Sequence, residues 1–141
     1  MATGRTFRPV CYDLDLDTYI PSALASIPHH APSTALVIVG TPLLDSTLRA
    51  LPNASSLEVF NVDFDYDADY PDPIFLDLLV YSMCDHHILS NSSFALCGPF
   101  LPEEDPNTHH VIAPDQWYTD TGVPLDDLMP AAWTRVSDKK A

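Results

Sequence analysis

The fold of this chain is decided by residues 72–101, which read DPIFLDLLVYSMCDHHILSNSSFALCGPFL. Asp72 and Pro73 are typical of a helix start, and the helix that follows is apolar on most faces. A short apolar strand is predicted at residues 87–89, and the turn Ser90–Ser93 leads from it into a helix of small residues. A polar turn after a parallel strand lies at the carboxyl end of that strand, where α/β folds bind nucleotides.

The alternation of helix and strand extends toward both ends of the chain. Asp17 is predicted to cap a helix that runs through Ile27, and Thr41 with Pro42 is predicted to open a second helix. Three more apolar runs predict strands: residues 35–39 (ALVIV), 57–62 and 110–113. Short links between such elements favour a layered α/β fold with a parallel sheet.

We therefore expect a Rossmann-like three-layer α/β domain with a short parallel sheet over residues 13–118. Residues 1–12 have no pattern and are expected to be a frayed lead-in. Residues 119–141 are expected to form a partly ordered carboxyl-terminal tail.

Composition limits the partners of this chain. With 141 residues, 46% of them hydrophobic, the chain can bury the core of one domain. Six Lys and Arg against 20 Asp and Glu give a net charge of −14, which repels nucleic acids and anionic membranes. No run approaches ~18 consecutive apolar residues, so direct membrane insertion by this chain is not expected. The three cysteines form no even disulfide framework.

Asp77, Ser92 and Ser93 are the first candidates for a binding site. An ionised carboxylate accepts hydrogen bonds from the NH groups of a nucleobase, and hydroxyls with backbone NH groups at a helix start suit a diphosphate. The residues alone favour a simpler interpretation, in which one serine caps the helix and Asp77 is solvated. A resemblance to a known family reverses this preference.

Residues 72–101 resemble the donor-site signature of α-1,2-fucosyltransferases of glycosyltransferase family 11. In that family an Asp-initiated helix with Ser-x-Cys precedes Ile-x-(Ser/Ala)-Asn-Ser-(Ser/Thr)-Phe and a Gly. The matching residues here are Asp77, Ser82, Cys84, Ile88, Ser90, Asn91, Ser92, Ser93, Phe94 and Gly98. The resemblance extends more weakly over residues 13–118, from the helix at Asp17 to the closing segment 110–118.

The resemblance implies one half of a GT-B-type fucosyltransferase, the carboxyl-terminal half that binds GDP-fucose. The implied reaction transfers L-fucose to a galactoside hydroxyl with inversion, by direct displacement and without a metal or another cofactor. Asp77 is the implied contact to the base or ribose, and Ser92, Ser93 and the backbone of Phe94 are the implied phosphate contacts. Asn91 is implied to shape the turn. The resemblance does not decide between two locations for the protein, the Golgi lumen and the cytoplasm.

The sequence also departs from the family. The motif His-x-Arg-x-Gly-Asp-Tyr is absent, and neither Arg5 nor Arg8 has a matching context. The motif's arginine neutralises the donor diphosphate, so this chain alone is expected to be inactive, and no catalytic residue is assigned. Nucleotide sugar and galactoside acceptor are expected partners only together with the missing half. The alternative is a non-catalytic module that binds a nucleotide or a protein partner.

Two other groups of residues could bind metals. The acidic segment with Asp63, Asp65 and Asp67 starts like a calcium loop but has Ala68 where a glycine is needed, so we interpret it as solvated. The histidines occur in adjacent pairs at 29–30, 86–87 and 109–110. Neighbouring side chains of a strand point to opposite faces, so no pair can hold one ion, and loop or strand-edge positions are expected.

Overall fold

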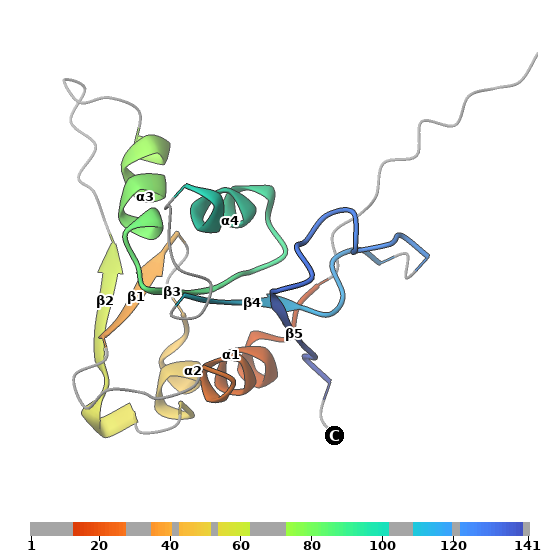
Figure 1. Ribbon diagram of the computed structural model, residues 1–141. Coiled ribbons are helices and arrows are strands. Elements are labelled where there is room, and N and C mark those ends of the chain that lie inside the picture. Colours follow the sequence, from red (N-terminus) through yellow and green to blue (C-terminus); the bar gives the residue numbers. More distant parts are fainter. Residues whose placement is uncertain are drawn as a thin grey trace, which may run out of the picture.

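Strands and helices alternate along the chain and form a mixed α/β fold with two short parallel sheets (Figure 1). The structure is a computed structural model that describes residues 13–27, 35–40, 43–51, 54–62, 73–101, 109–119 and 122–139. Its helices are α1 (Leu16–Ala25), α2 (Asp45–Arg49), α3 (Pro73–Ser82) and α4 (Ser93–Cys97), with short 3₁₀ turns η1 (Ala54–Ser56) and η2 (Gly98–Phe100). Its strands are β1 (Ala35–Val39), β2 (Glu58–Val62), β3 (His86–Ile88), β4 (His110–Pro114) and β5 (Thr134–Val136).

The strand pairs are parallel, as the sequence predicts, but the strands form two separate sheets and not the single sheet that is expected. Strand β1 pairs with β2 in a register that places Ala35 opposite Glu58. In the second sheet β4 lies between β3 and β5, with His86 opposite His110 and Ile112 opposite Thr134. All three carboxyl ends of this sheet therefore lie at one edge.

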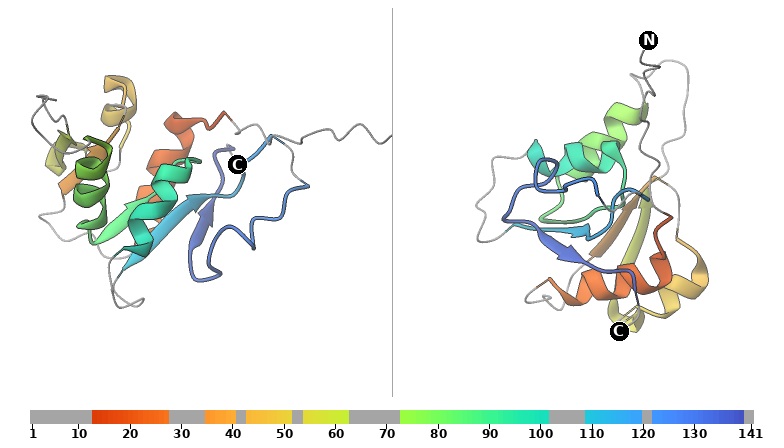
Figure 2. Two further views of the ribbon diagram at one scale, coloured as in Figure 1. Left: turned by 90° about the horizontal axis from the view of Figure 1, so that it is seen from above. Right: turned by 90° about the vertical axis from the view of Figure 1, so that its right-hand side faces the viewer.

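The core lies on both faces of the three-stranded sheet because side chains of a strand alternate between its faces. Ile112 belongs to one cluster, with the buried Tyr19 and Leu24 of α1. Its neighbours Val111 and Ala113 belong to the other cluster. Helices α1 and α2 lie on one side of the strands, and α3 and α4 lie on the other (Figures 1 and 2). Burial on both faces explains why β4 is an almost continuous apolar run.

The start of α1 differs from the prediction. Asp15 caps the helix, and its carboxylate accepts from the backbone N–H of Asp17 at 3.2 Å and from the hydroxyl of Thr18 at 2.9 Å. Asp17 lies inside the first turn, so the prediction that it caps the helix is wrong. Its carboxylate instead accepts from the hydroxyl of Thr47, which ties α1 to α2. The predicted opening of the second helix, residues 41–42, lies outside the described residues.

Residues beyond 119 contribute to the sheet. Strand β5 pairs with β4, and the buried Met129 joins the cluster of Val111 and Ala113. The buried Asp138 accepts from the backbone N–H of Asp15 at 3.0 Å. The sequence analysis expects only a partly ordered tail here and does not predict this strand. The expected lead-in, residues 1–12, lies outside the described residues.

Candidate ligand site at the carboxyl edge of the sheet

The loops that follow β3 and β4 meet at the carboxyl edge of the three-stranded sheet. Strand β3 leads into Ser90, Asn91 and Ser92, and β4 leads into residues 115–118. The side-chain Nδ2 of Asn91 donates to the backbone oxygen of Trp117 at 3.3 Å, so the two loops are in direct contact. This is the edge at which parallel α/β sheets bind ligands.

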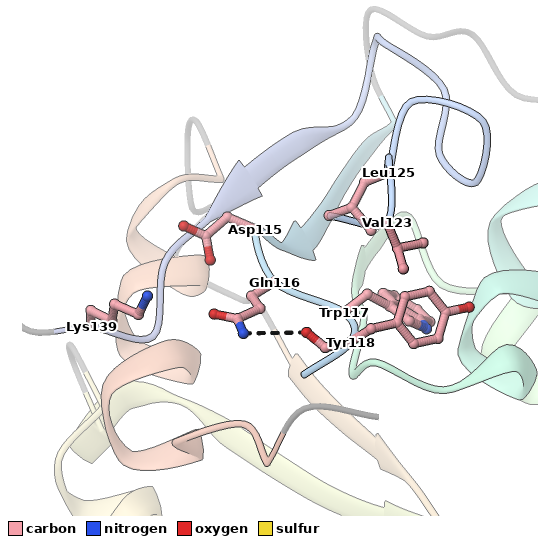
Figure 3. A pocket seen from close by; sticks show the side chains of 7 residues that line it. All are labelled: Asp115, Gln116, Trp117, Tyr118, Val123, Leu125 and Lys139. Carbon is pink, nitrogen blue, oxygen red and sulfur yellow. Dashed lines mark hydrogen bonds between the residues drawn. The ribbon is translucent and has the colours of Figure 1, made fainter. Parts of the chain in front are cut away.

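A hollow of about 240 Å³ lies beside this contact (Figure 3). Its lining combines a polar part and an apolar part, and Figure 3 shows Lys139 and Tyr118 at its opposite ends. The side chain of Gln116 donates to the backbone oxygen of Tyr118 at 3.2 Å, which fixes the loop between them. The lining residues are Asp115, Gln116, Trp117, Tyr118, Val123, Leu125 and Lys139.

The hollow is lined by both apolar and polar side chains. Trp117 is 3% exposed and is part of the core, so its position is fixed by packing. Aromatic and aliphatic walls suit a sugar or a base, whereas Asp115, Gln116 and Lys139 supply a carboxylate, an amide and a cation for polar groups. The other cation of this part of the chain, Arg135, pairs with Asp126 at 2.8 Å.

The turn predicted at Ser90–Ser93 follows β3, and it ends where α4 begins, at Ser93; Phe94 lies in the first turn of α4. Ser92 precedes the helix without a side-chain capping bond, and its N–H donates to the oxygen of Ser90 at 2.8 Å. Ser93 is exposed and Phe94 is half-buried. Asn91 contacts the loop that lines the hollow, through Trp117.

Asp77 lies in the middle of α3 and is half-buried. Its Oδ1 atom is buried and has no hydrogen-bond partner among the residues that the structure describes. Within the same residues no hydrogen bond connects Asp77 with Ser92 or Ser93. The structure joins the loop after β3 to the loop that lines the hollow.

The buried hydroxyl of Tyr19 fixes the backbone beneath this edge. It donates to the carbonyl of Leu89, immediately after β3, at 2.7 Å. Burial, together with the charges of Tyr81 and Asp115, raises the pKa of Tyr19 far above its ordinary value. The hydroxyl therefore stays protonated at all physiological pH values and acts as a permanent donor.

Four histidines gather at the opposite, amino-terminal edge of β3 and β4. The ring Nδ1 of His87 lies 2.6 Å from Nε2 of His109, and its own Nε2 lies 2.7 Å from the carbonyl oxygen of Tyr81. The rings of His86 and His110 lie side by side, with centroids 5.2 Å apart. His87 is 1% exposed, which the expected loop or strand-edge positions did not anticipate.

Burial lowers the pKa of His87 to about 4. The hydrogen bond to the Tyr81 carbonyl opposes this shift, and the neighbouring His109 and His86 add to it. His87 is therefore neutral at physiological pH and acts as a structural link between β3 and the end of α3. In the described parts of the chain, no group of three or more His, Cys, Asp or Glu side chains could hold a metal ion. The acidic segment at Asp63 lies outside those parts.

Sequence reasoning missed most residues of the hollow. Asp115 and Gln116 carried a usable signal, because they are the first polar residues after a buried parallel strand. No sequence signal indicated Val123, Leu125 and Lys139, because the pairing of β5 with β4 brings them to the hollow.

The fold and the hollow together define an α/β protein with a candidate ligand site at the carboxyl edge of a parallel sheet. Comparison of the chain with protein-family models, with curated proteins and with solved structures gave no match. In the described residues no helix is both long enough and apolar enough to cross a membrane.

Proposed function

We propose that this chain is a Rossmann-like nucleotide-sugar-binding domain that takes GDP-fucose at the carboxyl edge of β3 and β4. The contact between Asn91 and Trp117 carries this proposal, because it joins the loop after β3 to the loop that lines the hollow. The turn matches the fucosyltransferase signature described above, and nucleotide sites of parallel α/β proteins lie at this edge.

The proposed roles follow from the chemistry of each group. The hydroxyls of Ser92 and Ser93 and the backbone of Phe94 are the proposed contacts of the diphosphate. The aromatic walls at Trp117 and Tyr118 suit the sugar or the base, and Lys139 offsets negative charge. Asp77 is proposed as the contact to the base or ribose on the family resemblance alone, since its Oδ1 is buried in the structure.

The activity that we propose for the complete protein is inverting fucosyl transfer to a galactoside hydroxyl, as an α-1,2-fucosyltransferase. We propose that this chain by itself binds the donor without turning it over. The sequence lacks the arginine motif, and a leaving GDP would meet a chain of net charge −14. No metal and no other cofactor is proposed for this step.

A non-catalytic module that binds a protein partner is the second candidate. One observation favours it, namely the apolar outer face of α3, where Phe75 is 60% exposed and Leu79 is 46% exposed. Both candidates can hold for one chain, because α3 and the hollow offer different surfaces.

The test is an NMR titration of the 141-residue chain with GDP, GDP-fucose and ADP, without added metal. We expect saturable shifts near residues 90–94 and 115–118, stronger for the guanine nucleotides than for ADP. Ser92→Ala combined with Ser93→Ala should weaken binding about tenfold, which corresponds to ~1.4 kcal/mol. Ser55→Ala, at an exposed position in η1, is the matched control and should bind normally.

Three results would argue against the proposal. If the protein is folded and none of the three ligands changes its spectrum, the chain has no donor site. Equal binding of ADP and GDP would show that the site has no preference for guanine. This result would contradict the proposed role of Asp77. Unchanged affinity in the double serine variant would place the ligand elsewhere on the chain.

A further inference from the structure

The hollow at the carboxyl edge of the sheet is too small for a whole nucleotide sugar. Its volume is about 240 Å³. Pockets that enclose drug-sized ligands measure roughly 300–1,000 Å³. Only one part of GDP-fucose can therefore fill the hollow, and the three parts to compare are the diphosphate, the sugar and the base.

The diphosphate is the part that fits the hollow worst. Lys139 is the one cation among the described residues that line the hollow, and the carboxylate of Asp115 lies in the same lining. The structure shows no ion pair of either group within the residues that it describes. The two opposite charges offset each other, and the net charge of −14 repels an anion. The diphosphate therefore belongs outside the hollow.

The walls of the hollow favour the base over the sugar. Figure 3 shows the apolar lining residues at one end and the polar lining residues at the other. A sugar carries hydroxyls around its whole rim, and those that face the apolar end would lose their hydrogen bonds to water. A base has two flat faces that pack against aromatic and aliphatic side chains, and its hydrogen-bonding groups lie along its edges. The apolar end consists of Trp117, Tyr118, Val123 and Leu125, and the polar end of Asp115, Gln116 and Lys139.

The polar end of the hollow matches the edge of guanine. This edge carries the carbonyl oxygen O6 beside two donors, the N1–H and the N2 amino group. A carboxylate only accepts hydrogen bonds and can take both donors, whereas an ammonium group only donates and suits the oxygen. Adenine offers one donor group, its N6 amino group, at the corresponding edge. A carboxylate at this place, Asp115, therefore favours guanine by one charge-assisted hydrogen bond.

The lining is held in place by hydrogen bonds within the protein. The backbone N–H of Asp115 donates to the oxygen of Val136 at 3.0 Å, which ties the start of the loop to β5. Trp117 is buried, and its backbone oxygen accepts from Asn91 at 3.3 Å. A site that is fixed in advance loses less entropy when it binds a ligand.

We propose that the hollow binds the guanine base of the donor and that Asp115 is the residue that selects guanine over adenine. This inference rests on the proposed function, because it assigns one part of the same nucleotide sugar. Of the two contacts that the resemblance implies for Asp77, the base and the ribose, only the ribose then remains.

The test compares GDP, inosine diphosphate and ADP, which differ only in the base. NMR titration of the full 141-residue chain measures the Kd of each nucleotide. We expect shifts at residues 115–118, 123 and 125, and a Kd about tenfold lower for GDP than for ADP. Inosine lacks the N2 amino group, so we expect an intermediate Kd for inosine diphosphate.

Three variants separate Asp115 from other carboxylates. Asp115→Asn should reduce the preference for GDP over ADP to about twofold or less, because the amide has one acceptor oxygen instead of two. Asp115 is exposed, so the variant should keep the spectrum of the folded protein. Asp127→Asn is the matched control, since Asp127 is an exposed carboxylate between β4 and β5 that does not line the hollow. Asp127→Asn and Asp77→Asn should both retain the preference.

A preference for GDP that survives Asp115→Asn would overturn this inference and leave the proposed donor site intact. Shifts at residues 90–94 without shifts at residues 115–118 would have the same consequence, because the base would then lie outside the hollow. If none of the three nucleotides binds the folded chain, the proposed donor site and this inference are both wrong.

Discussion

His87 joins three parts of the protein through its two ring nitrogens. A carbonyl oxygen only accepts, so the ring Nε2 must carry a proton toward Tyr81. In the neutral ring Nδ1 is then an acceptor, and His109 donates to it from its own Nε2. The contact between the two rings accommodates one proton between the two nitrogens.

We predict that acid weakens the fold through His87. Its folded pKa of about 4 lies below the unfolded value of 6.5, so its contribution is fully present above pH 6.5 and is lost as pH falls toward 4. Between pH 7 and pH 5 the loss amounts to about 2 kcal/mol of unfolding free energy. Urea denaturation at both pH values measures it. His87→Gln should flatten this slope, and an equal slope in that variant would contradict the prediction.

Two buried tyrosines allow a matched comparison. The hydroxyl of Tyr19 donates to the carbonyl of Leu89 at 2.7 Å, whereas the buried hydroxyl of Tyr81 has no hydrogen-bond partner among the described residues. Tyr19→Phe should lower the free energy of unfolding by about 1–2 kcal/mol because the Leu89 carbonyl loses its donor. Tyr81→Phe should be neutral or stabilising by up to ~1 kcal/mol. Denaturation of both variants at pH 7 measures the two changes. Equal losses of unfolding free energy would show that the packing of the rings, and not the hydrogen bond of Tyr19, determines stability.

At the scale of elements, the contact between α3 and η2 depends on the absence of a side chain at Gly98. A Cβ atom at this position would overlap the ring of Tyr81, which is itself held by His87. Gly98→Ala should therefore lower the free energy of unfolding by about 1–3 kcal/mol. Cys97→Ala, at the exposed neighbouring position, is the control and should change it little. A stable Gly98→Ala protein would mean that Tyr81 can move aside.

The sequence predicts four of the five strands and all four helices in outline, because each of these elements has an apolar run or a helix-start signal. The cap of α1 is predicted two residues too late, since Asp15 and Asp17 are equally good caps and packing against Thr47 decides between them. Strand β5 is missed because Thr134 and Arg135 are exposed and carry no apolar pattern. Its place follows from pairing with β4, which no local pattern contains.

The candidate site shows the same division between local and long-range information. The turn at Asn91 and Ser92 is predicted from the order of strand and turn, and it lies there. The hollow itself requires residues from two separated segments, Asp115–Tyr118 and Val123–Lys139, so no local motif could reveal it. A contact between Asp77 and the turn rests on the family resemblance and stays a prediction.

For the whole molecule, charge is the dominant surface property. A net charge of −14 on 141 residues produces repulsion that opposes the folded state. Added salt screens this repulsion, since the screening length falls to roughly 4–5 Å at about 0.5 M. The melting temperature should therefore rise by several degrees between low ionic strength and about 0.5 M NaCl.

Calorimetry in NaCl and KCl measures this rise. The two salts should act alike and most of the effect should be complete by about 0.3 M, as screening requires. A melting temperature that is insensitive to salt would indicate that the acidic side chains are too far apart to repel one another.

The hydrogen bond between Asp15 and Asp138 spans 123 positions of the chain. Helix α1 packs against β3, β4 and β5, so its binding surface is completed only when the last strand has paired. During synthesis α1 leaves the ribosome before β3, β4 and β5, so Tyr19 and Leu24 stay unburied until these strands have been made. The nascent chain thus exposes an apolar helix face over that part of translation.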